Sequence, residues 1–280
     1  MRESQNIFLP GGFKQFRILK TKYVLYDKHV LVIGSGSEKI AEKMIESGAS
    51  SATMIVNDYD SLINARLNLI KDSKVLVKMM DFDNTDFDAA EFDLVYAQAS
   101  ISLLNRNKIV KEIKRILKPE AILCVGEITA LTNDFPPFVR NIFDTSDILA
   151  LVNDDCGAYY AERNFSVLYE EDLSSSLQSF YEHTAEELDD KIYNLTDKEK
   201  SFYKKLLSKI SHESNAYLKL GADRYIGFKM LILRKNNFVI SKESSTEKSN
   251  PHRTKRFLPL VEMTNKSVYL QIIIWRDNFC

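Results

Sequence analysis

The stretch that decides the fold is His29-Val-Leu-Val-Ile33, followed directly by Gly34-Ser35-Gly36. A short apolar run of this kind is typical of a strand buried on both faces of a parallel sheet. The two glycines permit a tight turn and let the backbone approach a ligand closely. Ile40, Ala41 and Met44 then recur at helical spacing. A strand, a glycine turn and a helix in this order predict the first βα unit of an α/β domain.

The same alternation continues along the chain to about residue 125. Apolar runs typical of strands recur four more times and are separated by amphipathic, helix-like segments. The four runs are residues 53–56, 75–80, 92–97 and 121–125. This rhythm predicts a parallel, doubly wound sheet.

Beyond Glu127 the pattern changes toward longer helices. Two segments, Thr184-Ala-Glu-Glu187 and Thr196-Asp-Lys-Glu199, have capping-box spacing, which predicts that a helix begins at each. An apolar stripe is predicted where apolar residues follow one another at intervals of four, at Phe202, Leu206 and Ile210. A helix from Pro136 and strands over residues 165–169 and 225–233 complete the predicted elements.

Composition and charge narrow the functional classes. The chain has 280 residues, of which 45% are hydrophobic, so it can bury a full core and is not disordered throughout. Lys plus Arg number 38 and Asp plus Glu 39, which argues against a nucleic-acid partner. No Cys-x-x-Cys pair or other metal motif is present, so no metal is expected. Neither a signal peptide nor a membrane span is visible, and we expect a cytoplasmic protein.

Polar residues at the ends of the first three strands suggest a ligand site, because ligands of open parallel sheets bind at that edge. Gly34-Ser35-Gly36 ends the first strand and offers backbone amides to an anion. Asp58, after the second strand, can accept hydrogen bonds from both ribose hydroxyls or can cap a helix, as Asp60 could also do. Asp81 and Phe82, after the third, suit an adenine, or else Asp81 begins a turn in a solvated acidic loop.

Taken in order, these pieces resemble a class I S-adenosylmethionine-dependent methyltransferase, similar to the ubiquinone and menaquinone biosynthesis type. The resemblance covers roughly residues 9–235. It rests on Pro10-Gly11-Gly12, the glycine turn, Asn57-Asp58, Met80-Asp-Phe82, Phe92-Asp-Leu-Val-Tyr-Ala-Gln98, Ile113-Lys-Arg-Ile-Leu-Lys-Pro119 and the last strand with its lead-in, residues 224–235. The fold that it implies is a Rossmann-like α/β domain with a seven-stranded, mostly parallel sheet, helices on both faces, an inserted helical pair and a C-terminal extension.

The resemblance also implies S-adenosylmethionine as cofactor and a set of residues that would bind it. The set is Gly34, Ser35 and Gly36 at the methionine moiety, Asp58 with Tyr59 at the ribose, Asp81 and Phe82 at the adenine, and Ala97 and Gln98 near the transferable methyl. Methyl transfer is an in-line displacement at a sulfonium carbon, in which alignment and desolvation supply most of the acceleration. No catalytic residue is therefore assigned, and none is required by the chemistry.

Three positions depart from the family pattern. Val32 stands where the family has an acid, Ser37-Glu38 replaces a third loop glycine, and Glu120-Ala121 replaces a Gly-Gly pair. Glu38 could partly substitute for the missing acid. The departures leave open a non-catalytic methyltransferase-like partner or scaffold. A nicotinamide-dependent Rossmann enzyme is a further alternative, which the pieces at residues 92–95 and 117–119 disfavour.

Several other polar and aromatic side chains carry two interpretations. Glu127, at the end of a strand, is expected to be a solvated carboxylate. His183 is either a general base or, more simply, an exposed helix histidine. Tyr159 and Tyr160 either line a substrate pocket or belong to core or surface packing. Cys124, within a strand, is expected to be inert core.

The expected organisation and function follow from these patterns. We expect a methyltransferase-like domain over residues 1–235, with an N-terminal lid over 1–28 and a helical insertion over 174–223. A linker over 236–255 and a tail over 256–280 follow, and the tail can dock as a strand or form a homodimer. The expected activity is methyl transfer from S-adenosylmethionine to a small-molecule acceptor, with no nucleic-acid partner.

Overall fold

The computed structural model describes residues 8–237. Its sheet has a path of seven strands in the order β3-β2-β1-β4-β5-β8-β7, and the short β6 pairs with β5. All pairs are parallel except those of β8, which runs antiparallel to β5 and β7. The strands are β1 His29–Ile33, β2 Ser51–Val56, β3 Val75–Met79, β4 Phe92–Gln98, β5 Leu117–Ala130, β6 Leu151–Val152, β7 Phe165–Asp172 and β8 Ile226–Lys235. The predicted Rossmann-like, mostly parallel fold is confirmed.

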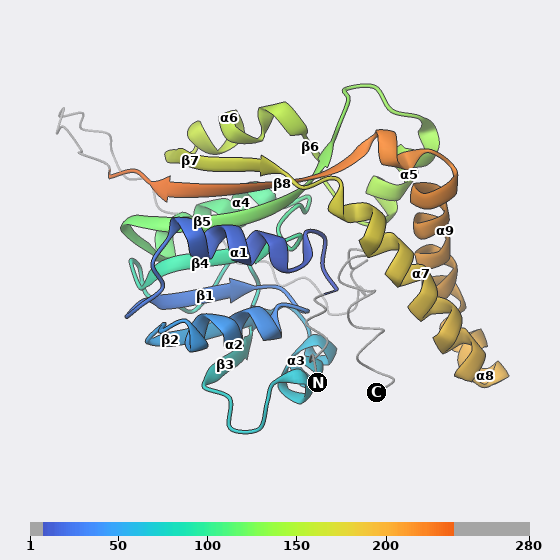
Figure 1. Ribbon diagram of the computed structural model, residues 1–280, viewed down its shortest axis with the longest axis horizontal. Coiled ribbons are helices and arrows are strands. Elements are labelled where there is room, and N and C mark those ends of the chain that lie inside the picture. Colours follow the sequence, from blue (N-terminus) through green and yellow to red (C-terminus); the bar gives the residue numbers. More distant parts are fainter. Residues whose placement is uncertain (1–7, 238–280) are drawn as a thin grey trace, which may run out of the picture.

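Helices cover both faces of the sheet and form two separate cores (Figure 1). One core includes apolar side chains of α1, α2, α3, α5, α7 and α9, and the other includes those of α4 and α6. The helices are α1 Gly12–Lys22, α2 Glu38–Glu46, α3 Tyr59–Asn68, α4 Arg106–Ile116, α5 Pro137–Thr145, α6 Cys156–Ala161, α7 Ser176–Asn194, α8 Asp197–Phe202 and α9 Lys204–Lys219. Two-sided burial explains why the central strands are almost continuously apolar.

The strand β5 is longer than its apolar run predicts. It covers 14 residues, and its segment from Ile122 to Ala130 pairs residue by residue with β8. Gly126 lies inside this ladder because a side chain there would collide with Phe228 and Gln15, at 2.4 and 2.2 Å. The long antiparallel ladder therefore extends the sheet beyond the length of the neighbouring β4.

Two local predictions about the helical insertion have different outcomes. The capping box at Thr196 and Glu199 is confirmed, since it begins α8. The one at Thr184 is wrong, because this residue lies within α7 and its hydroxyl donates to the carbonyl of Phe180, at 2.8 Å. Phe202 is 81% exposed rather than part of an apolar stripe, because α8 ends there and the chain turns before α9.

The arrangement of the insertion matters for the site. Helices α5, α7, α8 and α9 lie beyond the carboxyl ends of the parallel strands (Figure 1). The predicted tail over 256–280, most of the linker, and any homodimer formed through the tail lie outside the described residues. Within residues 8–237, no helix is long and apolar enough to cross a membrane.

Candidate functional site

The glycine turn after β1 is held by close backbone packing. Gly34 and Gly36 have φ angles of 104° and 81°, in the left-handed region that favours glycine. The Gly34 amide donates to the carbonyl of Ile55, at 2.9 Å. A Cβ on Gly34 would lie 2.5 Å from Cβ of Ser100, whose hydroxyl donates to the carbonyl of Ile33, at 2.7 Å. Gly34 is therefore required by the neighbouring loop, whatever ligand the turn binds.

A carboxylate reaches this turn from the first residue of α2. Glu38 is only 5% exposed, and its Oε1 accepts a hydrogen bond from the Gly36 amide, at 3.0 Å. Val32, at the position where the family has its acid, is fully buried in the core. The turn thus has an acidic side chain beside it, supplied by the helix instead of by the strand.

The second acidic position, Asp58, caps a helix. It lies two residues after the end of β2 and is the N-cap of α3. Its two carboxylate oxygens accept from the Ser61 amide, at 2.9 Å, and from the Ser61 hydroxyl, at 2.6 Å. Asp60 is exposed and is not the cap, and Tyr59 is 65% exposed. An ionised carboxylate has about four acceptor sites, so helix capping is compatible with ribose binding.

Asp81 and Phe82, which come soon after β3, lie in different environments. Asp81 is exposed and begins a tight turn, in which the Asn84 amide donates to its carbonyl, at 3.2 Å. Phe82 is 4% exposed and belongs to the same core as Phe87. The Phe82 ring is therefore covered by protein, and the sequence expectation that it stacks on adenine has no support in its placement.

The end of β4 holds the N-terminal segment in place. The Gln98 side chain is 1% exposed, and its amide nitrogen donates to the carbonyls of Pro10 and Gly12, at 2.7 and 2.9 Å. Its oxygen accepts from the Tyr96 hydroxyl, at 2.5 Å. Gln98 is thus a buried clamp that fixes residues 10–12 over the end of the strand.

Two further contacts strengthen this clamp. The Gln15 side chain donates to the carbonyl of Ala97, at 3.2 Å, and the Gly11 amide donates to the Ser176 hydroxyl, at 3.1 Å. Ala99, immediately after the strand, has a φ of 54°. A non-glycine residue in this region costs roughly 1–2 kcal/mol, so the surrounding contacts must hold the loop in its conformation.

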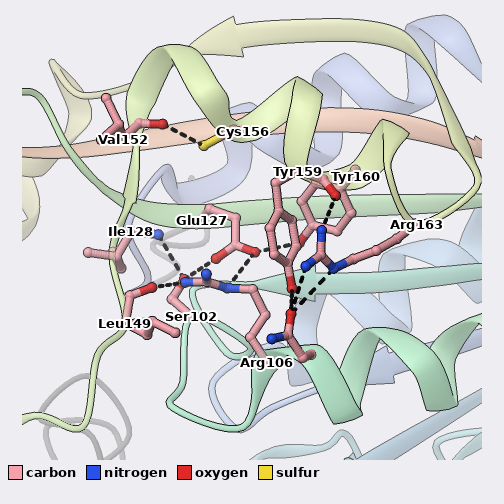
Figure 2. A network of polar contacts seen from close by, with 11 residues as sticks. Ser102, Arg106, Glu127, Ile128, Leu149, Val152, Cys156, Tyr159, Tyr160 and Arg163 are labelled. Carbon is pink, nitrogen blue, oxygen red and sulfur yellow. Dashed lines mark hydrogen bonds and ion pairs between the residues drawn. The ribbon is translucent and has the colours of Figure 1, made fainter.

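A fully buried ionic network lies on the opposite face of the sheet, between β5, α4 and α6 (Figure 2). Nε of Arg106 lies 3.3 Å from Oε1 of Glu127, and the two side chains are 1% and 0% exposed. The hydroxyls of Ser102 and Tyr160 donate to the two oxygens of Glu127, and the Arg106 guanidinium donates to the carbonyl of Leu149.

The network shows that Glu127 and Tyr160 are buried parts of the core. Glu127 is not a solvated carboxylate, because its charge is enclosed by Arg106 and two hydroxyl donors. Tyr160 is core rather than pocket lining, and burial, with the nearby Glu127 charge, raises the pKa of its phenol well above the usual value. Cys124 is buried, as expected, and burial raises the pKa of its thiol.

A cavity of about 460 Å³ lies between the N-terminal segment and α7. Its lining includes Phe13, Arg17, Phe180 and His183. His183 is about one-third exposed, stacks on Phe8 with ring centroids 4.0 Å apart, and has Nε2 3.3 Å from a carboxylate oxygen of Glu187. The histidine is therefore a wall of a cavity rather than a fully exposed helix residue.

Part of the chain matches a known family. Residues 31–125 match the family model described as methyltransferase domain. This part of the chain therefore resembles a methyltransferase domain. The matched residues run from β1 into β5 and include the glycine turn, Asp58, Asp81 and Gln98. No curated protein shows a significant sequence match to the chain.

Several solved structures share the fold of the chain. Phosphoethanolamine N-methyltransferase 2 of Haemonchus contortus, in complex with S-adenosyl-L-methionine, has a TM-score of 0.66 at 15% identity, over 83% of this chain and 54% of that one. Geranyl diphosphate C-methyltransferase of Streptomyces coelicolor A3(2) has 0.57 at 13%, over 79% and 77%. The [4+2]-cyclase SpnF has 0.63 at 19%, over 80% of each chain. The domain match over residues 31–125 and this shared fold support a methyltransferase-like domain of the class I type.

The residues present fit S-adenosylmethionine, the cofactor that the resemblance to methyltransferases implies. Two carboxylates, Asp58 and Asp81, follow adjacent parallel strands and suit the ribose and the adenine amine. The glycine turn with Glu38 beside it suits the zwitterionic methionine end, since it combines a backbone turn with a buried carboxylate. Among residues 8–237, no cluster of side chains suited to a metal ion is found.

Proposed function

We propose that the protein transfers the methyl group of S-adenosylmethionine to a small-molecule acceptor. The observation that carries the proposal is the position of the helical layer. Helices α5 and α7–α9 lie beyond the carboxyl ends of the strands, the same edge at which the glycine turn, Asp58 and Asp81 lie (Figure 1). A cavity between the N-terminal segment and α7 adjoins the end of β4, because Gln98 holds residues 10 and 12 there and residue 12 is part of the cavity lining.

We assign the cofactor contacts as follows. The turn that approaches the methionine moiety is Gly34, Ser35 and Gly36. Glu38 accepts a hydrogen bond from the ammonium group of the methionine moiety, and so takes the role of the acid that Val32 replaces. Asp58 accepts from the ribose hydroxyls. These assignments rest on the burial of Glu38 beside the turn and on the position of Asp58 after β2.

Two more contacts complete the assignment. Asp81, which is exposed at the end of β3, accepts from the exocyclic amine of the adenine. Phe82 is left out because it is covered by the core. Gln98 and Ala97 act near the methyl position by holding the N-terminal segment, and they do not touch the acceptor. Gln98 holds residues 10 and 12, and the carbonyl of Ala97 holds residue 15.

S-adenosylmethionine supplies a sulfonium-activated methyl group, so the protein has to align the acceptor and exclude water. Gln98 and Gln15 perform the second task by fixing the start of α1 over the end of β4. The balanced charge of the chain and the size of the cavity, about 460 Å³, support a small molecule over a nucleic acid.

Asp58→Asn tests the ribose assignment without removing the helix cap, since asparagine caps about as well as aspartate. We expect the affinity for S-adenosylhomocysteine to fall about tenfold, because a hydrogen bond to a charged group contributes about 1.5–3 kcal/mol. Isothermal titration calorimetry measures this change, and a thermal melt should show little loss of stability.

Asp60→Asn is the matched control, because Asp60 is exposed, lies two residues further along the chain and is not the cap of α3. It should leave the affinity unchanged. Equal losses in the two variants, or unchanged affinity in Asp58→Asn, would show that Asp58 serves only as the cap of α3.

A further inference from the structure

We propose that the cavity between the N-terminal segment and α7 is the acceptor site, and that it takes a small molecule with a flat apolar body and an anionic group. The anionic group is a carboxylate or a phosphate. This inference rests on the proposed methyl transfer and deepens it by naming the class of acceptor. It is carried by three features of the cavity lining: its aromatic walls, its cations and its position.

The walls of the cavity are aromatic on both sides. Phe8 and Phe13 come from the N-terminal segment, and Phe180 and His183 come from α7. The His183 ring lies nearly parallel to that of Phe8, with an interplanar angle of 19° and a centroid distance of 4.0 Å. Since Glu187 contacts Nε2 of His183, the ring is also held from the helix side. Because Phe8 and His183 stack on each other, they form one joined part of the lining, against which a flat apolar group can pack.

The charges on the N-terminal side are positive. The helix α1 carries Lys14, Arg17, Lys20 and Lys22 and no acidic residue. Lys14 and Arg17 line the cavity, and Nζ of Lys14 lies 2.9 Å from Oε1 of Glu171. Arg17 is exposed, and within the described part of the chain it forms no ion pair. A planar guanidinium matches a carboxylate or phosphate, so Arg17 is the group that would recognise the anion.

The position of the cavity connects it with the proposed chemistry. Gly11 and Gly12 are part of its lining, and Gln98 holds this same segment on the end of β4. On the opposite side, Ser176 of α7 accepts a hydrogen bond from the Gly11 amide. The cavity therefore borders the end of the central strand, where the methyl group is proposed to lie, and residues 11 and 12 form the edge past which the acceptor has to reach.

The test is a binding comparison with three matched probes, phenyl phosphate, benzoate and benzyl alcohol, on the full chain. Ligand-observed NMR titrations are made with and without S-adenosylhomocysteine. At least one of the two anions is expected to bind at least tenfold more tightly than the neutral alcohol. The Arg17→Gln variant should bind that anion about tenfold more weakly than the unmodified chain does. Comparing the two anions shows which headgroup the site prefers.

Lys20→Gln is the control, because it removes a charge from the same helix outside the cavity lining. It should leave anion binding unchanged, and all variants should melt at the temperature of the unmodified chain. Equal binding of the alcohol and both anions, equal losses in Arg17→Gln and Lys20→Gln, or no binding of any probe would each overturn the proposal. Failure of S-adenosylhomocysteine to bind, with anion selectivity intact, would instead count against the proposed function.

Discussion

Replacing Arg106 by methionine is expected to lower the free energy of unfolding by about 3–5 kcal/mol, because it leaves the Glu127 carboxylate buried without its counter-charge. Both side chains are almost completely inaccessible, and Arg106 is the first residue of α4, where a cation faces the positive end of the helix dipole. This placement is tolerated because the guanidinium forms an ion pair with Glu127 and donates a hydrogen bond to the carbonyl of Leu149.

Urea denaturation followed by circular dichroism measures this loss. Arg234→Met is the matched control, because the Arg234–Glu120 pair is about half exposed on both sides and should contribute less than about 1 kcal/mol. Pairing Arg106→Met with Glu127→Leu should recover much of the stability, since an apolar pair of similar volume often replaces a buried ion pair without loss. If Arg106→Met were as stable as Arg234→Met, the buried ion pair would contribute no more to stability than the exposed one.

Glu38→Gln is expected to weaken binding of S-adenosylmethionine by roughly ten- to a hundredfold, because it removes the negative charge beside the glycine turn. The same variant should bind 5′-methylthioadenosine as the unmodified chain does, because that molecule lacks the amino-acid end. Calorimetric titration of both ligands therefore separates a role at the methionine end from a general loss of the site.

Glu46→Gln provides the control for this experiment. It lies on the same helix, is exposed, and pairs with Lys43 at the opposite end from the turn. Its affinities should equal those of the unmodified chain. A Glu38→Gln variant that loses both ligands equally, or neither, would contradict the idea that Glu38 replaces the missing strand acid.

The fold could be predicted largely because the strands are buried on both faces. The run from Val30 to Ile33 is apolar since its residues alternate between the cores on the two faces of the sheet, and the glycine turn after it precedes the first residue of α2. Local spacing was less reliable for helix starts. The pattern at Thr184 fits a capping box as well as the one at Thr196 does, and the difference lies in where α7 begins, which depends on tertiary packing.

The site was harder to predict because its decisive contacts join distant residues. Nothing in the sequence near Glu127 shows that Arg106 and Tyr160 enclose it, so a strand-end glutamate suggests exposure. Gln98 likewise clamps residues more than 80 positions away. The position of Asp58 after a strand is compatible with a helix cap and with a ribose contact; the structure shows the cap, and the ribose contact stays a prediction.

The measurement that tests the central claim most directly is calorimetric titration of the unmodified full chain with S-adenosylmethionine, S-adenosylhomocysteine and NAD. The account predicts saturable one-to-one binding of the first two and none of NAD, since the glycine turn, Glu38, Asp58 and Asp81 are assigned to the adenosylmethionine skeleton. Binding of NAD with no binding of S-adenosylmethionine would contradict it. Binding of none of the three would also do so, and would leave a methyltransferase fold that acts as a partner or scaffold.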